Sequence, residues 1–314
     1  VGVSSNLPAI STICRHRNTP LLVDEAWGPH FHFHPELPLS AMQSGADAAV
    51  SSTHKMLGAL TQGALLLARN GALDPRRLSS AVDLTQTTSP AAFIFASLDA
   101  SRRQMALQGR ALLDRTLDLA RMLRAELAKL DGLAIIEPGI VRDRPGVAFD
   151  STRIIVDVHE LGISGYAAEE QLRNQHGVFV EMSDLLSVML LVTIGNDERS
   201  VEAALDGFRS LTSMRRDERQ SVRTRSTGSL LFAGAAELTP RQAHFALAEM
   251  IPLQRAKGRI SADTITPYPP GIPLVAPGER LTAEVLDYLQ MGVAEGMHIS
   301  GLTDATLEHV RVVR

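Results

Sequence analysis

The sequence has 314 residues, 45% of them apolar and 21% charged, which is the balance of an ordinary globular protein with a sizeable core. It carries 31 basic and 35 acidic residues, and a net charge of −4 gives no basic surface for nucleic acid or anionic lipid. The longest apolar stretch, around Leu185–Ile194, is about half of what a bilayer span needs. The single cysteine, Cys14, cannot form an internal disulfide and fits a reducing compartment. We therefore expect a soluble, cytoplasmic protein that binds neither nucleic acid nor membrane.

The first residues of the chain and its small number of lysines carry further information. The chain begins with Val1-Gly2-Val3, without an initiator methionine or the pattern of a signal peptide. Only three of its basic residues are lysines: Lys55, Lys129 and Lys257. Any chemistry that requires a side-chain primary amine therefore has three candidates.

Residues 1–70 predict alternating helices and strands. We expect one helix and three short buried strands, in this order: Asn6–Asn18, Leu21–Val23, Ala48–Ser51 and Gly63–Ala68. This alternation is typical of an α/β fold with a mainly parallel sheet, in which functional residues gather at the carboxyl ends of the strands. Asp24 and the segment Ser51–Lys55 would lie at that edge.

The middle of the chain predicts a long helix that begins near Ser89-Pro90 and ends before Asp131-Gly132. Its apolar face recurs at steps of three and four residues: Leu113, Leu117, Ala120, Leu123, Leu127 and Leu130. Three strands and a helix are expected to follow: Ile154–Val158, Val178–Glu181, Val188–Ile194 and Glu198–Leu211. We expect the chain to end in a short helical stretch.

Two local patterns have more than one interpretation. The apolar run Leu21–Val23 followed by Asp24-Glu25 resembles a nucleotide-hydrolase strand, but the glycine-rich loop ending in Gly-Lys that such enzymes need is missing. His30, His32 and His34 would share one face of an extended strand and could then bind zinc. Alternatively, Pro29 and Pro35 would keep the segment a loop, in which the histidines bond to nearby backbone.

A third pattern combines Asp24 with Lys55, each just after a predicted strand. This pair suits pyridoxal phosphate. The lysine amine forms a Schiff base with the cofactor aldehyde, and the carboxylate keeps the pyridinium nitrogen protonated, so that the ring acts as an electron sink. The hydroxyls of Ser51, Ser52 and Thr53 could hold the phosphate.

A series of motifs extends this pattern over essentially the whole chain: Asp24–Pro35, Ser52–Lys55, Thr87–Pro90, Val180–Asp184, Thr193–Asn196, Thr266–Pro273 and Pro277–Glu279. In kind and order they resemble those of the prokaryotic ornithine/lysine/arginine decarboxylases. The resemblance implies an α/β fold with an aspartate-aminotransferase-like, pyridoxal-phosphate-dependent major domain, whose mostly parallel sheet is incomplete at the N-terminus. Smaller α/β C-terminal units would follow.

The resemblance also implies roles for particular residues. Lys55 would be the Schiff-base lysine, Asp24 would pair with the pyridinium nitrogen, and Ala26 would lie against the cofactor ring. Ser52 and His54 would contact the phosphate or the region of the Schiff base, and His54 is a catalytic candidate together with Asp24 and Lys55. Because the cofactor of this family lies at a dimer interface, Thr87 or Thr88 would reach the phosphate of the neighbouring subunit in a homodimer or larger homo-oligomer. Three acidic residues are candidates for binding the distal cation of the substrate: Glu181, Asp184 and Glu279.

The resemblance divides the chain into four segments. They are residues 1–130, the C-terminal part of the cofactor-binding large domain; 131–212, a smaller α/β segment; 213–228, an arginine-rich linker; and 229–314, a decarboxylase C-terminal domain. The histidine run occurs in the family without a metal, so we expect no metal site. Trp27 stands where many members have histidine. The family carries a substantial stretch before the position of Val1, so we expect a fragment or a truncated gene product.

The expected function is the pyridoxal-phosphate-dependent decarboxylation of lysine, ornithine or arginine to the corresponding amine and CO2. Two alternatives stay open. One is an aminotransferase-type reaction on the same fold, and the other is a truncated homologue without catalytic activity.

Overall fold

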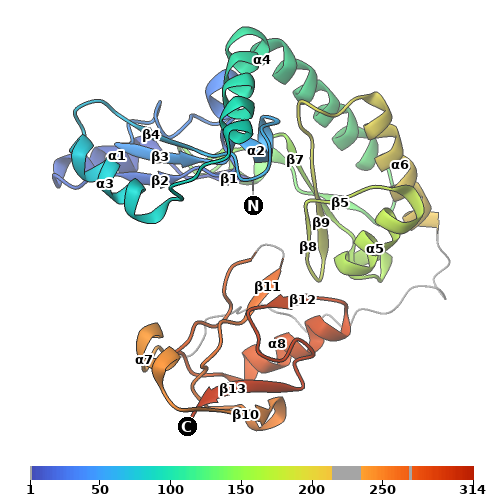
Figure 1. The fold of residues 1–314 in the computed structure, drawn as a ribbon. Coiled ribbons are helices and arrows are strands. Elements are labelled where there is room, and N and C mark those ends of the chain that lie inside the picture. Colours follow the sequence, from blue (N-terminus) through green and yellow to red (C-terminus); the bar gives the residue numbers. More distant parts are fainter. Residues whose placement is uncertain (1, 214–234, 269–270) are drawn as a thin grey trace. The chain divides into compact units, whose positions relative to one another are not determined.

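The computed structural model describes residues 2–213, 235–268 and 271–314 (Figure 1). The chain folds into two compact units. Unit 1 consists of Val1–Lys129, Ile135–Ile154 and Leu191–Leu205, and unit 2 of Leu130–Ala134, Ile155–Leu190 and Asp206–Arg314. The predicted boundaries at residues 130, 212 and 228 stay predictions, and all of the expected linker after Ser213 lies outside the described residues.

The elements up to the end of the long helix are β1 (Val3–Ser4), α1 (Leu7–His16), β2 (Leu22–Asp24), η1 (Phe31–Phe33), β3 (Ala48–Ser51), α2 (Thr53–Met56), β4 (Leu65–Ala68), α3 (Pro75–Thr85) and α4 (Ala92–Leu127). The following elements are β5 (Ala134–Ile135), η2 (Pro138–Val141), β6 (Ala148–Phe149), β7 (Arg153–Asp157), η3 (His159–Leu161), α5 (Gly165–His176), β8 (Met182–Ser183), β9 (Ser187–Leu191) and α6 (Glu198–Ser213). The C-terminal part contains α7 (Pro240–Phe245), β10 (Ala248–Pro252), η5 (Leu253–Arg255), β11 (Thr266–Tyr268), α8 (Ala283–Ala294), β12 (His298–Ser300) and β13 (His309–Val313).

A three-stranded sheet of order β2-β3-β4 forms the part of unit 1 that carries the predicted site. Strands β2 and β3 run parallel, whereas β4 returns antiparallel to β3. Helix α1 precedes this sheet and begins where Asn6 accepts a hydrogen bond from the backbone of Ala9, an N-cap that satisfies one free helix donor. Three small buried residues, Ala41, Ala46 and Ala49, allow close packing of the neighbouring apolar side chains from α1 and β2.

Helix α4 buries the apolar face that the spacing predicts, with Leu113, Leu117 and Leu127 almost completely covered. The helix begins at Ala92 with Ala91 as its N-cap, two residues after the predicted N-cap Ser89, whose backbone N–H donates to the Thr87 hydroxyl. It also ends at Leu127, a few residues before the predicted stop. The N-terminal half packs against the residues that follow β3, since Met105 belongs to one cluster with Met56 and Leu57.

Strands β5, β7, β9 and β8 form a four-stranded sheet in that order. The predicted strand Val178–Glu181 was wrong. Helix α5 ends at His176 and is capped by Gly177, whose φ of 63° is left-handed, and the N–H of Val178 donates to the carbonyl of Leu172. Val178 is thus part of a helix end, and the next strand, β8, starts only at Met182.

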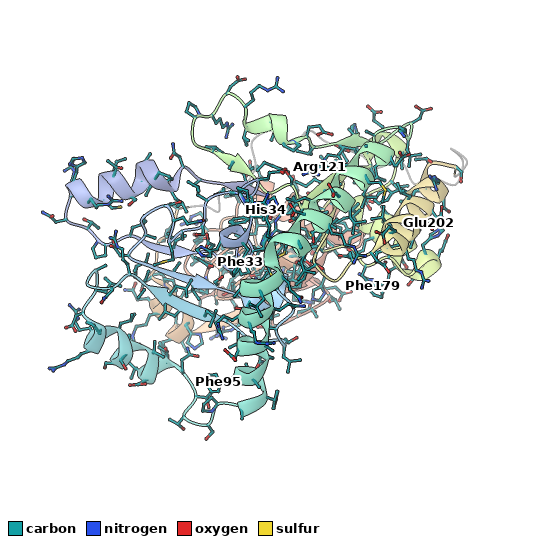
Figure 2. All side chains as sticks on the ribbon, turned by 90° about the horizontal axis from the view of Figure 1, so that it is seen from above. Phe33, His34, Phe95, Arg121, Phe179 and Glu202 are labelled. Atoms are coloured by element: carbon teal, nitrogen blue, oxygen red, sulfur yellow. The ribbon has the colours of Figure 1, made fainter. Side chains whose placement is uncertain are left out.

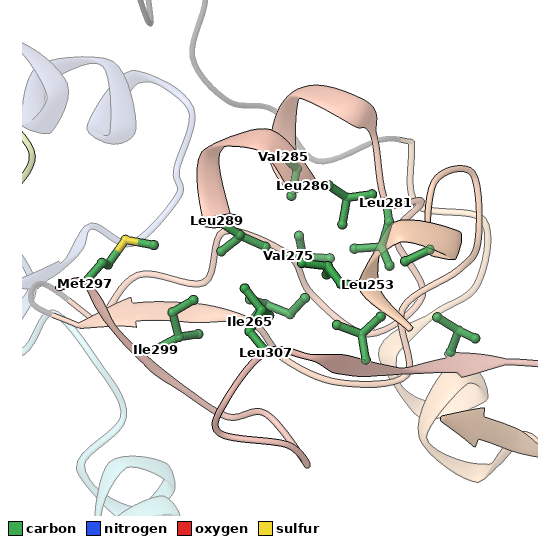
Figure 3. Close-up of a cluster of buried hydrophobic side chains, with 13 residues drawn as sticks. Leu253, Ile265, Val275, Leu281, Val285, Leu286, Leu289, Met297, Ile299 and Leu307 are labelled. Carbon is green, nitrogen blue, oxygen red and sulfur yellow. The ribbon is translucent and has the colours of Figure 1, made fainter. Parts of the chain in front are cut away.

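The C-terminal part of unit 2 contains two antiparallel strand pairs, β10 with β13 and β11 with β12. The chain therefore ends in a strand, not in the expected helical stretch. Thirteen buried apolar residues from these strands, helix α8 and the intervening loops form what we call the C-terminal cluster: Leu253, Ala256, Ile265, Val275, Leu281, Val285, Leu286, Leu289, Met297, Ile299, Leu307, Val310 and Val312 (Figure 3). None of the helices in the described residues is both long and apolar enough to cross a bilayer.

Candidate active site

The carboxyl ends of β2 and β3 bring the predicted site residues together. Asp24 lies opposite Val50 in the parallel register, and the pairing continues beyond the strands, because Glu25 donates its N–H to the Val50 carbonyl and Ser52 donates its N–H to Ala26. The chain then turns into the short helix α2, where Lys55 donates its backbone N–H to Ser52. Asp24, Ala26, Ser52, His54 and Lys55 therefore lie along one edge of the sheet, as the sequence predicts.

The side chains of Asp24 and Lys55 are open to solvent. Both Asp24 and Lys55 are exposed, and Asp24 is oriented by the hydrogen bond that its Oδ1 accepts from the Ala26 N–H at 2.9 Å. The Lys55 Nζ lies 5.3 Å from the centroid of the Trp27 ring. Within the described ranges, this amine has neither a hydrogen bond nor an ion pair. The unpaired amine of Lys55 and the Oδ2 of the exposed Asp24, which accepts no hydrogen bond from any described residue, are both accessible to an incoming cofactor.

The loop after Lys55 is fixed through His54 and helix α4. His54 Nδ1 lies 2.9 Å from the Gly63 carbonyl oxygen, which also accepts the backbone N–H of His54. Because a carbonyl only accepts hydrogen bonds, Nδ1 carries the proton and Nε2 is the nitrogen left to accept one. A Cβ at Gly63 would stand 2.9 Å from the Leu60 carbonyl, so the loop keeps glycine here. The buried Ser101 hydroxyl of α4 donates to the Leu57 carbonyl at 2.7 Å.

Glu25, next to Asp24, is held in a different environment. Its Oε1 accepts the backbone N–H of Ala41 at 2.6 Å. Burial raises the pKa of this carboxyl to about 7, although the Ala41 hydrogen bond acts in the opposite direction. Of the two adjacent acids, Asp24 is the one whose carboxylate is open to a cofactor.

Beneath Trp27 lies a group of buried charges that sequence reasoning missed. We call Trp27, His30, Asp150, Thr152 and Arg153 the Trp27 cluster. Arg153 Nε donates to Asp150 Oδ2 at 3.1 Å, and His30 Nε2 lies 3.3 Å from the same oxygen. The other carboxylate oxygen accepts both the N–H and the hydroxyl of Thr152. Burial by itself would raise the pKa of Asp150, but His30, Arg153 and Thr152 outweigh it and lower the pKa to about 2.

The histidine run does not form the extended strand that a shared zinc-binding face would need. Phe31–Phe33 is a single 3-10 turn, so His30 and His34 turn to different carboxylates. Figure 2 shows His34 beside the long helix α4, where its Nε2 donates to Asp114 Oδ1 at 2.8 Å while its Nδ1 accepts the N–H of Glu36. In the part of the chain that the structure describes, no group of three or more His, Cys, Asp or Glu could hold a metal ion.

The remaining predicted residues lie in other places. Thr87 and Thr88 are exposed in the connection between α3 and α4. Glu181, Asp184 and Glu279 belong to unit 2. Asp184 Oδ1 accepts two N–H groups and a hydroxyl within the β8–β9 turn, and Glu279 accepts the N–H of Ala276. The predicted roles of these five residues stay predictions.

An acid and a lysine at the carboxyl ends of adjoining parallel strands are the arrangement with which one class of α/β enzymes holds pyridoxal phosphate on a lysine. Sequence comparison then identifies the family. The profile of the Orn/Lys/Arg decarboxylase major domain matches residues 1–200, and that of the Orn/Lys/Arg decarboxylase C-terminal domain matches residues 230–306. The chain belongs to the Orn/Lys/Arg decarboxylase family, and the expected fold class is confirmed.

Individual relatives agree with this assignment. The chain is 36% identical to an arginine decarboxylase of Bacillus subtilis over 314 residues, which cover the whole chain and 64% of that protein. It is 27% identical to the constitutive lysine decarboxylase of Escherichia coli, with 88% of this chain and 50% of that protein aligned. The crystal structure of a Francisella novicida lysine decarboxylase has the same fold, with a TM-score of 0.80 at 23% identity over the whole chain and 56% of that protein. The chain thus spans less than two thirds of the length of these relatives.

The enzymes of this family depend on pyridoxal phosphate, and the residues present fit that cofactor. The fit rests on the open amine of Lys55 and the open carboxylate of Asp24 at one sheet edge. Both groups follow from the local sequence pattern. Asp150 and Arg153, in contrast, lie more than 120 residues from Trp27, and no motif marks them.

Proposed function

We propose that the protein decarboxylates a basic amino acid with pyridoxal phosphate, releasing CO2 and the corresponding amine. The observation that carries the proposal is the placement of Asp24 and Lys55 at the carboxyl ends of β2 and β3. The 36% identity to an arginine decarboxylase favours arginine over lysine and ornithine as the substrate. The single cysteine of the chain agrees with a cytoplasmic enzyme.

Each residue of the edge has a defined task in this proposal. Pyridoxal phosphate, when bound, supplies a ring that accepts the electron pair left when the carboxylate bond breaks. Lys55 would hold the cofactor through its amine, and Asp24 would keep a proton on the ring nitrogen. Ala26 would leave room for the ring, whereas Ser52 and the Nε2 of His54 would contact the phosphate or the atoms beside Lys55.

The substrate and the neighbouring subunit would add further contacts. A cationic side chain that leaves water needs a charge-assisted hydrogen bond, and Glu181, Asp184 and Glu279 are the acids proposed to provide it. Thr87 and Thr88 are exposed and would reach the phosphate bound by a second subunit. The proposal therefore includes a homodimer or a larger homo-oligomer.

The three lysines allow a sharp test of cofactor attachment. Incubation with pyridoxal phosphate followed by borohydride reduction should give one pyridoxyl group, located on Lys55 by peptide mass spectrometry. Lys55→Ala should abolish the adduct, whereas Lys129→Ala, a change at an exposed lysine paired with Glu126, should leave it intact. Equal labelling of Lys129 or Lys257 in the wild-type protein would contradict the proposed site.

A second measurement identifies the reaction. With arginine, lysine or ornithine labelled at the carboxylate, the loaded protein should release labelled CO2, and Lys55→Ala should release none. Asp24→Asn should lose most of the rate while keeping the fold. Conversion of the cofactor to its amine form by the substrate, without CO2, would indicate an aminotransferase. A protein that forms no adduct would be a homologue without catalytic activity.

A further inference from the structure

The Trp27 cluster brings a guanidinium, an indole and the Lys55 amine together in unit 1. The Cζ atom of Arg153 lies 4.1 Å from the centroid of the Trp27 ring, and Lys55 Nζ lies 5.3 Å from the same centroid. Arg153 Nη2 also donates to the backbone carbonyl of Trp27 at 3.1 Å. One guanidinium thus fixes both the ring and the backbone of the residue that lies beside the lysine.

The guanidinium is itself held in one orientation. Its Nε donates to Asp150 Oδ2, and Asp150 is in turn fixed by the two hydrogen bonds from Thr152. Arg153 and Asp150 are only 2% and 1% exposed. A planar guanidinium with a fixed fork of donors can stack on an aromatic face and bind a carboxylate at the same time, which a lysine ammonium cannot do.

The burial of these charges argues for a role in geometry. A buried ion pair is often no more stabilising than apolar side chains of the same volume, because both charges lose their hydration. Such a pair does restrict its neighbours to one arrangement. Here the restricted neighbour is Trp27, and the part of the chain that the structure describes offers the Lys55 amine no other polar or aromatic contact.

We propose that Arg153, held by Asp150, is a positioning residue that fixes the indole of Trp27 as the wall beside Lys55. This inference rests on the proposed function. In that function the indole of Trp27 limits the positions that the Lys55 amine, and the cofactor attached to the amine, can take. Arg153 acts through Trp27 and touches neither substrate nor cofactor. Its removal loosens the wall and weakens cofactor attachment.

Trp27 is the only tryptophan of the chain, so its fluorescence reports on the wall directly and without cofactor. Arg153→Met should lower the fluorescence anisotropy of Trp27 and raise its quenching by acrylamide about twofold. Arg153→Lys, which keeps the charge but lacks the planar fork, should give a smaller change in the same direction. Arg102→Met is the matched control, because Arg102 is an exposed arginine paired with Asp99 on α4, and it should change neither signal.

The second readout is the dependence of borohydride-trapped pyridoxyl-Lys55 on the concentration of pyridoxal phosphate. The strength of a cation–π contact predicts that Arg153→Met raises the half-saturating concentration about threefold to tenfold. In a Trp27→Ala background the same substitution should have no further effect, because Arg153 acts through the indole.

Two results would overturn the inference: unchanged Trp27 signals in both Arg153 variants, or an equal loss of trapping with and without the indole. If Arg153→Met does not fold, as judged by circular dichroism, Arg153→Lys decides by the same criteria. If the wild-type protein traps no pyridoxyl group, the proposed function fails, whereas the fluorescence comparison still decides whether Arg153 positions Trp27.

Discussion

The C-terminal cluster and the polar residues beside Trp27 (His30, Asp150, Thr152 and Arg153) are both buried, but different forces hold them. The C-terminal cluster consists of thirteen apolar side chains, so each contributes a share of dispersion and of the hydrophobic effect. The Trp27 cluster depends on directed bonds around a single carboxylate, Asp150. Loss of one side chain should therefore remove only its own share of the contacts in the C-terminal cluster. In the Trp27 cluster, loss of Asp150 should disrupt all of the directed bonds around its carboxylate together. We expect the directed bonds of the Trp27 cluster to fix the orientation of its side chains, whereas the apolar contacts of the C-terminal cluster mainly contribute stability.

The largest effect is expected for Asp150→Ala. Removal of the carboxylate breaks the buried ion pair between Asp150 and Arg153, which costs about 3–5 kcal/mol of unfolding free energy. Urea unfolding followed by Trp27 fluorescence measures it. A loss smaller than the roughly 3 kcal/mol expected for Leu289→Ala would mean that the Trp27 cluster is no more cooperative than the apolar one.

Leu289→Ala tests the other cluster and should cost about 3 kcal/mol, the usual loss for a fully buried leucine. Hydrogen exchange of the β10 and β13 amides measures this local stability. Val293→Ala, at a partly exposed position of the same helix, is the matched control and should cost much less. Equal losses at the two positions would show that burial in the C-terminal cluster does not determine the effect.

The stability contributions of Glu25 and Asp150 should depend on pH in opposite ways, because the pKa of Glu25 is raised and that of Asp150 is lowered. The pKa of Glu25 is raised by burial to about 7, so the folded protein holds a proton that the unfolded chain has already released. The stabilisation is complete below about pH 4.5 and is lost as the pH rises through 7, by at most about 3 kcal/mol, because water screens this half-buried carboxyl in part. Glu25→Gln should remove this dependence, as measured by unfolding between pH 5 and 8.

The pH dependence that Asp150 contributes to stability has the opposite sign. Its pKa is lowered to about 2, so its contribution is present above the ordinary aspartate value and is lost as the pH falls through about 2. Acid unfolding of Glu25→Gln should therefore match that of the wild-type protein below pH 4. A shift of the acid unfolding transition in Glu25→Gln would contradict the prediction that Glu25 and Asp150 act in different pH ranges.

The smallest effect is expected for Asp99→Asn, which removes an exposed ion pair with Arg102 one turn along α4. Surface pairs of this kind contribute less than about 0.5 kcal/mol, because water and salt screen both charges. Thermal unfolding at low and high salt measures the difference. A loss of stability comparable to that of Asp150→Ala would show that burial does not determine how much an ion pair of this protein contributes to the free energy of unfolding.

Much of the proposed site could be predicted because its chemistry is encoded locally. Asp24 and Lys55 each follow a short apolar strand, and parallel strands place their carboxyl ends at one edge, so two short motifs sufficed to bring them together. The apolar face of α4 was predictable for the same reason, since its period of three to four residues lies within one helix. Val178–Glu181 was mistaken for a strand because a β-branched, apolar composition does not distinguish a strand from the residues that close a helix.

The sequence by itself therefore determined the family, the α/β class and the acid–lysine pair, all of which rest on motifs and local periodicity. Only the tertiary structure decided that His30 and His34 lie beside different carboxylates and that Arg153 lies over the Trp27 ring. Those contacts join residues 80 and 126 positions apart in the chain, as His34–Asp114 and Arg153–Trp27 do. No period or spacing encodes such pairs, because they form only when packing brings distant segments to one point.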